Sequence, residues 1–152
     1  DPDAYDKGFR HCDLLVVGAG PAGLMAALTG GRAGASVILC DEDFRMGGRL
    51  NAETLSVGGM PGAEWAAGAV AELASLPNVR LMPRTTVYGV FDGGVFSAVE
   101  RVSDHLPVPR PGKPRQTLWR ITARASVLAA GAIERPVAFR DNDRPGIMLA
   151  GA

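Results

Sequence analysis

The chain has 152 residues, of which 47% are hydrophobic and 21% charged, a composition typical of a folded domain and not of a disordered segment. Its 16 basic and 16 acidic side chains balance, so no overall charge attracts it to nucleic acid. No apolar run approaches the roughly 20 residues that cross a bilayer, and no basic-then-apolar leader is present. We therefore expect one soluble, cytoplasmic domain over residues 1–152, with no membrane partner.

The first predicted element is a buried strand, Leu14–Val17, which runs directly into a G-x-G-x-x-G turn and then into an apolar helix. Gly18 permits the tight turn, Gly20 lets a pyrophosphate approach the backbone, and Gly23 lets the helix pack closely on the strand. Bare N–H groups and the helix dipole at the helix start attract phosphate. The candidate phosphate site is the whole turn, with Pro21 at the first helical position: Gly18, Ala19, Gly20, Pro21, Ala22 and Gly23.

A second apolar strand, Ser36–Cys40, follows Gly34, which suits a helix C-cap. It ends in Asp41, 18 residues after Gly23, close to the spacing of about 20 expected for a ribose-binding acid. A carboxylate there accepts hydrogen bonds from ribose hydroxyls and repels a 2′-phosphate. Asp41, with Glu42 beside it, therefore favours NAD or FAD over NADP; the alternative, glycines that only make a turn, fits fewer of these features.

The next segment, Asp43–Leu50, is a glycine-hinged loop directly beyond the ribose acid. Gly48 and Arg49 are candidate phosphate contacts, because this loop passes near the phosphates in flavoprotein-like folds. A turn with a solvent-facing arginine is the alternative. The periodicity then predicts a helix over Glu64–Leu76, followed by a short strand, Val79–Met82.

Three runs at meander spacing come next. Thr85–Phe91 and Val95–Arg101 are joined by Asp-Gly-Gly, a strong hairpin signal, and Leu118–Ala123 is the third, so the meander covers residues 85–123. Between the second and third runs, residues 107–114 include four prolines and predict an extended connector, either a mobile loop or a docking strap. Ser126–Ala132 is again a buried strand that leads into a glycine turn and belongs in the parallel sheet.

These elements predict an α/β fold: a Rossmann-like FAD/NAD(P)-binding domain with a parallel sheet, a helix layer and an antiparallel three-strand meander. We find no residue set for nucleophilic, metal or proton-transfer catalysis. Cys12 and Cys40 lack disulfide or metal spacing and are interpreted as inert packing thiols, and His105 as a structural hydrogen-bonding residue. The basic excess in residues 77–152 indicates a solvated loop or a subunit contact and not a nucleic-acid partner.

The chain resembles the two-dinucleotide-binding-domain flavoproteins, a group that includes the disulfide reductases, in its glycine turn, acid, G-G loop, meander and final A-x-G-A. More specifically, it resembles the alpha subunits of heterotetrameric sarcosine oxidases. The segments that carry this second likeness are residues 1–7, 101–106, 118–121, 131–136 and 142–152.

This resemblance implies that the chain is the N-terminal part of an NAD-binding region, truncated relative to a complete domain. It implies an oxidase that demethylates sarcosine to glycine, passes electrons through flavins to oxygen and hands the one-carbon unit to tetrahydrofolate. NAD would occupy the site described above, with FAD and FMN elsewhere in a complex with beta, gamma and delta subunits. The alternatives are an FAD-binding subunit of a cyanide synthase or opine oxidase type, and a non-catalytic, nucleotide-stabilised scaffold module.

The same resemblance adds two site residues. Val87 aligns with the position whose backbone meets the adenine, and Gly131 with the turn that closes over the dinucleotide. Ala130 stands where many relatives have threonine, so it offers no hydroxyl contact. Glu134 and Arg135 are either a recognition pair or a structural ion pair.

Overall fold

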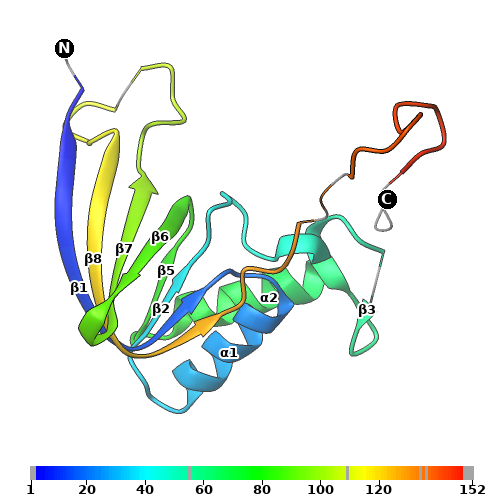
Figure 1. Cartoon of the computed structure of the whole chain (residues 1–152). Coiled ribbons are helices and arrows are strands. Elements are labelled where there is room, and N and C mark those ends of the chain that lie inside the picture. The colour runs from blue at the N-terminus through cyan, green and yellow to red at the C-terminus, as the bar shows by residue number, and fades with distance from the viewer. Residues whose placement is uncertain (1–2, 55, 109, 134, 136, 149–152) are drawn as a thin grey trace.

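The computed structural model describes residues 3–54, 56–108, 110–133, 135 and 137–148 (Figure 1). Its elements are, in chain order, β1 (Tyr5–Val17), α1 (Pro21–Arg32), β2 (Val37–Cys40), the 3-10 turn η1 (Gly48–Asn51), β3 (Ser56–Val57), β4 (Met60–Pro61), α2 (Gly62–Ser75), β5 (Val79–Met82), β6 (Thr85–Phe91), the 3-10 turn η2 (Asp92–Gly94), β7 (Val95–Arg101) and β8 (Gln116–Leu128). No helix among these residues is both long and apolar enough to span a bilayer.

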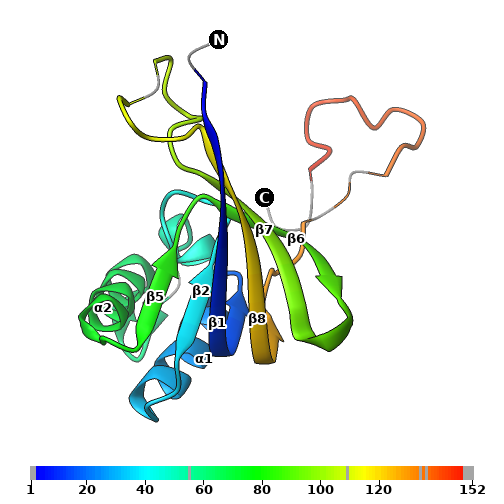
Figure 2. The same cartoon turned by 90° about the vertical axis from the view of Figure 1, so that its left-hand side faces the viewer.

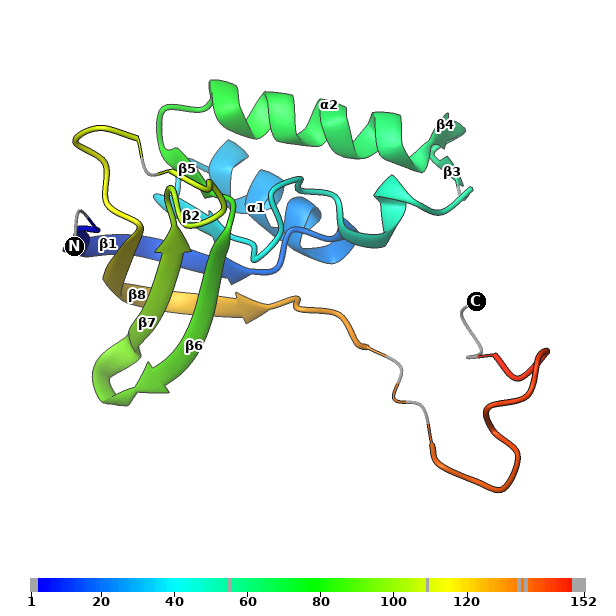
Figure 3. The ribbon, with the colours of Figure 1, turned by 90° about the horizontal axis from the view of Figure 1, so that it is seen from above.

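The main sheet has six strands in the order β5-β2-β1-β8-β7-β6, which Figure 2 shows from its edge strand β5 to β6. β5, β2, β1 and β8 run parallel, whereas β8, β7 and β6 form an antiparallel meander. Figure 3 shows α1 and α2 on one side of β1 and β8, and β6 and β7 on the other. The predicted fold class, with its parallel sheet, helix layer and meander, is confirmed.

β1 and β8 are longer than the sequence pattern predicts. Each has 13 residues, and they pair in parallel from Tyr5 with Gln116 to Val17 with Leu128. The prediction of separate strands at 118–123 and 126–132 was wrong, because β8 is one strand over Gln116–Leu128 that pairs with β1 on both sides of Arg124, whose guanidinium pairs with Asp13 at 3.3 Å. Residues 124–126 of β8 are exposed and include Arg124 and Ser126, so the hydrophobic pattern breaks there although β1 still pairs with this part of the strand.

β1 changes direction at Asp13. The backbone N–H groups of Asp13 and Leu14 both donate to the Ser36 carbonyl, at 2.9 and 3.0 Å, which interrupts the regular alternation of side chains. Consequently Cys12 and Leu15 lie in the same apolar cluster although they are three residues apart. The first halves of β1 and β8 therefore belong to the meander layer and their second halves to the parallel layer (Figure 1).

Two apolar clusters fill the faces of the sheet. One lies under the helices and includes Val16, Leu24, Leu39 and Leu73. The other lies between the parallel strands and the meander and includes Leu15, Ile38, Met82, Trp119 and Ile121. The helix predicted over 64–76 is α2, whose residues Ala69 and Leu73 are buried as expected, and the strands predicted at 79–82, 85–91 and 95–101 have the observed bounds.

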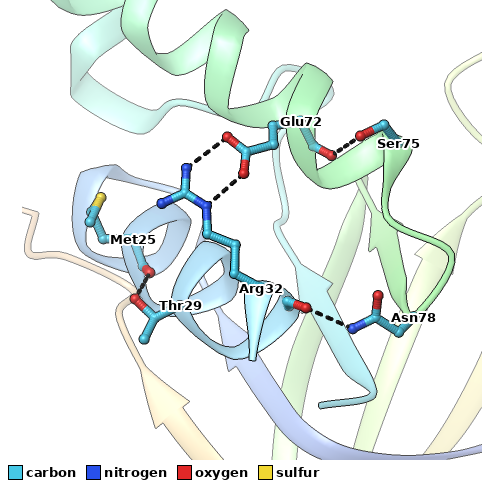
Figure 4. A network of polar contacts seen from close by, with 7 residues as sticks. Met25, Thr29, Arg32, Glu72, Ser75 and Asn78 are labelled. Atoms are coloured by element: carbon cyan, nitrogen blue, oxygen red, sulfur yellow. Dashed lines mark hydrogen bonds and ion pairs between the residues drawn. The ribbon is translucent and has the colours of Figure 1, made fainter. Parts of the chain in front are cut away.

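Polar contacts fix α1 against α2 and the turn before β5 (Figure 4). Arg32 donates from Nε and Nη2 to the two carboxylate oxygens of Glu72, at 2.6 and 2.8 Å. The Asn78 amide donates to the carbonyl oxygens of Gly31 and Ala35, at 2.9 and 2.7 Å, and so satisfies backbone acceptors at the end of α1. These contacts hold the helix that starts at the glycine turn in a fixed position on the sheet.

Candidate functional site

The first and third glycines of the turn are required by the fold itself. Gly18 has φ of +100°, and a Cβ there would overlap the carbonyl group of Ala129, just after β8. A Cβ on Gly23 would overlap the carbonyl oxygen of Gly18. The turn between β1 and α1 is thus packed as the sequence predicts, with the helix start lying directly on the strand end.

Gly20 differs from the other two. Its backbone, with φ of −70° and ψ of −176°, is open to any residue, and a Cβ there would meet no atom within 4 Å. The fold therefore gives no reason for a glycine at this position. Open space directly above the backbone is what a pyrophosphate needs in order to approach it.

The start of α1 offers hydrogen-bond donors to this space. Gly20 is the N-cap and makes no side-chain capping bond, Pro21 occupies the first turn, and the first turn carries no acidic residue. The N–H groups of a first helical turn have no intrahelical acceptor, so those of Ala22 and Gly23 suit an anion. The residues present therefore fit the phosphates of a dinucleotide.

Asp41 lies beside the turn and also holds it in place. Its Oδ2 accepts a hydrogen bond from the Ala19 N–H at 2.5 Å, and its Oδ1 accepts one from the Asp43 N–H at 2.8 Å. Its carbonyl oxygen accepts from the Thr85 N–H at 2.7 Å. The sequence placed this acid at the ribose but did not reveal its bond to the turn, because the spacing of residues does not show which backbone groups a carboxylate meets.

The loop after Asp41 packs on the same turn. The Gly47 N–H donates to the Ala19 carbonyl at 2.8 Å, and Gly48, with φ of +54°, lies so close that a Cβ on it would be 3.0 Å from Gly20 Cα. Arg49 is 64% exposed along its side chain and pairs with Glu53 at 2.5 Å. Gly48 is thus at the turn, whereas the guanidinium of Arg49 is engaged within its own loop.

The remaining predicted positions lie farther out. The carbonyl of Glu42 accepts a hydrogen bond from Arg101, which ties the ribose loop to the end of β7. Val87 lies in β6 and packs against the apolar cluster between the parallel strands and the meander. Gly131 is exposed beyond β8, with φ of +70°. Glu134 lies outside the described residues, so its suggested pairing with Arg135 stays a prediction.

The sequence pattern did not indicate two backbone contacts at the site. Ala129 supports Gly18, and its N–H donates to the Val17 carbonyl at 2.8 Å, while Thr85 joins β6 to Asp41. Both contacts use main-chain atoms, so no side-chain pattern marks them.

Burial raises the pKa of Cys40, the residue before Asp41, to about 12, so this thiol stays protonated and inert near neutral pH, as the sequence suggests.

Cavities are found at other places in the described part of the chain. One of about 560 Å³ lies at the bend of β1 and β8, beside Asp13, Gly94 and Arg124. Another, of about 470 Å³, lies between Tyr5 and the proline-rich connector.

A glycine turn facing an acid, two helices on one face of a parallel sheet and a meander on the other define a dinucleotide-binding flavoprotein domain. In agreement, the family model described as FAD dependent oxidoreductase matches residues 13–92. The chain belongs to this family.

Among solved structures, L-proline dehydrogenase from P. horikoshii is 26% identical with a TM-score of 0.68, over 95% of this chain and 27% of that one. A thioredoxin reductase from Gloeobacter violaceus shares the fold, with a TM-score of 0.60 at 22% identity over 85% of this chain and 37% of that one.

The curated relatives include longer proteins. The chain is 55% identical to the alpha subunit of sarcosine oxidase from Rhizobium meliloti (strain 1021) and 48% identical to that from Corynebacterium sp. (strain P-1), in each case over 100% of this chain. It is 34% identical to an opine oxidase subunit of Agrobacterium tumefaciens (strain Ach5), over 92% of this chain and 28% of that protein. The chain spans 15% and 16% of the length of the two sarcosine oxidase subunits. The resemblance to the sarcosine oxidase alpha subunits is confirmed.

Proposed function

We propose that this chain binds the ADP half of a dinucleotide, with NAD as the occupant, as part of the alpha subunit of a sarcosine-demethylating oxidase. The observation that carries the proposal is Gly20, a glycine that neither backbone conformation nor packing requires, at the bare N-terminus of α1. The phosphates would lie at Gly18–Gly23 and the adenine ribose at Asp41. In that role the chain binds and orients the nucleotide, and substrate oxidation takes place elsewhere in the assembly.

The choice between NAD and NADP depends on charge. Asp41 and Glu42 place two carboxylates at the end of β2, and both would repel a ribose 2′-phosphate. The relatives named as alpha subunits support a role within a multi-subunit enzyme, and the partners proposed here are beta, gamma and delta subunits. A working or regulatory cofactor and a purely structural nucleotide both fit this site, since a tightly bound ligand stabilises the folded state in either case.

FAD is the second candidate occupant. The family model describes an FAD dependent oxidoreductase, and an opine oxidase subunit is among the relatives. NAD and FAD share their ADP half, and the turn and acid described above would contact only that half. The groups that would distinguish nicotinamide from flavin therefore lie outside these residues.

Calorimetric titration of the folded protein with NAD, NADP and FAD tests the proposal. We expect NAD to bind more tightly than NADP and than FAD. Tighter binding of FAD would support the opine oxidase type of function. Binding of none of the three by a protein whose circular dichroism shows it to be folded would contradict the dinucleotide site itself.

A further inference from the structure

We propose that Phe44 and Arg84 form a stacking platform for the adenine base of the dinucleotide. This inference rests on the proposed function and adds a recognition element to the same site. It assigns a role to the exposed ring of Phe44, three residues after the ribose acid.

Phe44 is 66% exposed, although it lies within a well-fixed loop. Its N–H donates to Asp43 Oδ1 at 2.7 Å, and the Asp43 N–H donates to Asp41 Oδ1 at 2.8 Å. This chain of bonds fixes the backbone of Phe44 relative to the acid. A large apolar ring held at the surface beside a polar site offers a flat face to a planar ligand.

Arg84 comes from the turn between β5 and β6 and lies over the same ring. Its guanidinium carbon is 5.3 Å from the centre of the Phe44 ring, within the range of a cation–π contact. Its backbone has φ of +56°, an uncommon conformation for a residue with a side chain. Its N–H donates to the Asp43 carbonyl and its own carbonyl accepts from the Arg101 N–H, both at 2.9 Å. The two residues are thus held together by main-chain bonds and not by the ring contact alone.

The direction of the nucleotide places its base at this pair. From the phosphates at Gly20, the chain of the ligand passes the ribose at Asp41, and the base extends beyond the ribose. Beyond Asp41 the protein continues into the Phe44 loop and, through the Thr85 N–H bond to the Asp41 carbonyl at 2.7 Å, into the start of β6. Phe44 and Arg84 therefore lie where an adenine would arrive, and aromatic rings and planar guanidinium groups both stack on bases.

The test is a titration of the folded protein with NAD, with ADP-ribose, which keeps the adenine, and with nicotinamide mononucleotide, which lacks it. Phe44→Leu keeps an apolar side chain but removes the aromatic face, and we expect it to weaken NAD and ADP-ribose binding about tenfold, a typical loss for one stacked base. Phe44→Tyr keeps the ring and should bind as the wild type does. Any affinity for nicotinamide mononucleotide should be the same in all variants.

Phe9→Ala is the matched control, because Phe9 is also 66% exposed but lies in the first half of β1, away from Asp41. Its affinity for NAD should be unchanged. If the wild type binds NAD and Phe44→Leu binds it equally well, the platform is overturned while the dinucleotide site stands. If the folded wild type binds neither NAD, ADP-ribose nor FAD, the proposed function fails and the platform fails with it.

Discussion

The Asp41 carboxylate accepts the Ala19 N–H at 2.5 Å, so the acid that ends β2 is joined directly to the glycine turn that ends β1. The backbone adds a second link, in which the Gly18 N–H donates to the Cys40 carbonyl at 2.8 Å. The proposed phosphate and ribose parts of the site are therefore one bonded unit. Because these bonds join protein groups only, we expect them to hold the two parts in place without a ligand, which would lower the cost of ordering the site on binding.

Removing this acid should affect stability as well as binding. Asp41→Ala leaves the N–H groups of Ala19 and Asp43 without their acceptor, so we expect the free energy of unfolding to fall by about 1–3 kcal/mol. Asp41→Asn retains one acceptor oxygen and should lose less. Urea unfolding without ligand measures the effect. Equal stability of Asp41→Ala and the wild type would show that the carboxylate serves the ligand alone.

The two glycines Gly20 and Gly23 should separate binding from folding. Gly20→Ala adds a methyl group to open space at an N-cap, so the free energy of unfolding should change by no more than about 1 kcal/mol. The affinity for NAD should nevertheless fall sharply, because the methyl group would lie where the pyrophosphate approaches. Gly23→Ala forces a methyl group against the Gly18 carbonyl and should destabilise the protein by about 3 kcal/mol. Thermal unfolding and calorimetric titration of both variants provide the measurement. Normal NAD binding by Gly20→Ala, or better by the bulkier Gly20→Val, would contradict the phosphate site.

Trp119 is expected to be a major contributor to stability in the meander layer. Its Nε1 donates to Glu100 at 2.7 Å, and the guanidinium of Arg10 lies 4.5 Å from its ring centre. Trp119→Phe removes the donor and should cost about 1–3 kcal/mol in chemical unfolding. Trp65→Phe, at a partly buried position on α2, is the control and should cost less. A larger loss of unfolding free energy in Trp65→Phe than in Trp119→Phe would show that the face of α2 contributes more to stability than the meander layer does.

The buried thiols predict a loss of stability in alkali. Burial raises the pKa of Cys12 to about 11 and that of Cys40 to about 12, against 9.0 for an unperturbed thiol. Below pH 9 the thiols are protonated in both states and contribute no pH dependence. As pH rises from 9 toward 12, the unfolded thiols ionise while the folded ones keep their protons, so unfolding becomes easier.

Urea midpoints measured between pH 8 and pH 10.5 test this dependence. A double variant, Cys12→Ala with Cys40→Ala, should be less stable at pH 8 but should lose less stability on going to pH 10.5. The comparison cancels the tyrosines and lysines that titrate in the same range. Parallel pH profiles for the two proteins would show that the thiols do not contribute.

The local elements and the fold class could be predicted from the sequence, whereas the particular contacts between distant residues could not. The turn from Gly18 to Gly23 follows from neighbouring residues, and so do the hairpin at residues 92–94 and the helix that became α2. In contrast, the bond from Asp41 to Ala19 joins groups 22 residues apart and leaves no trace in the spacing. The bend at Asp13 also changes which residues of β1 face inward. A strict alternation of buried and exposed residues therefore does not hold along the whole strand from Tyr5 to Val17.

The length of β8 shows the same limit. Residues 124–126 are exposed and interrupt the alternation of the strand, yet they remain in β8 because β1 pairs with it on both sides of Arg124. The Arg124–Asp13 ion pair, which marks the point where both strands bend, joins residues 111 positions apart. Only the folded chain brings such partners together.

The pairing of β1 with β8 also sets the order in which the site can form during synthesis. Contacts between residues this far apart give a high contact order, which slows folding. The glycine turn leaves the ribosome before Ala129, which supports Gly18 and emerges more than 100 residues later. A nascent chain therefore cannot complete the packing of this turn until β8 has been made, so the nucleotide site that we propose can form only after the sheet has closed.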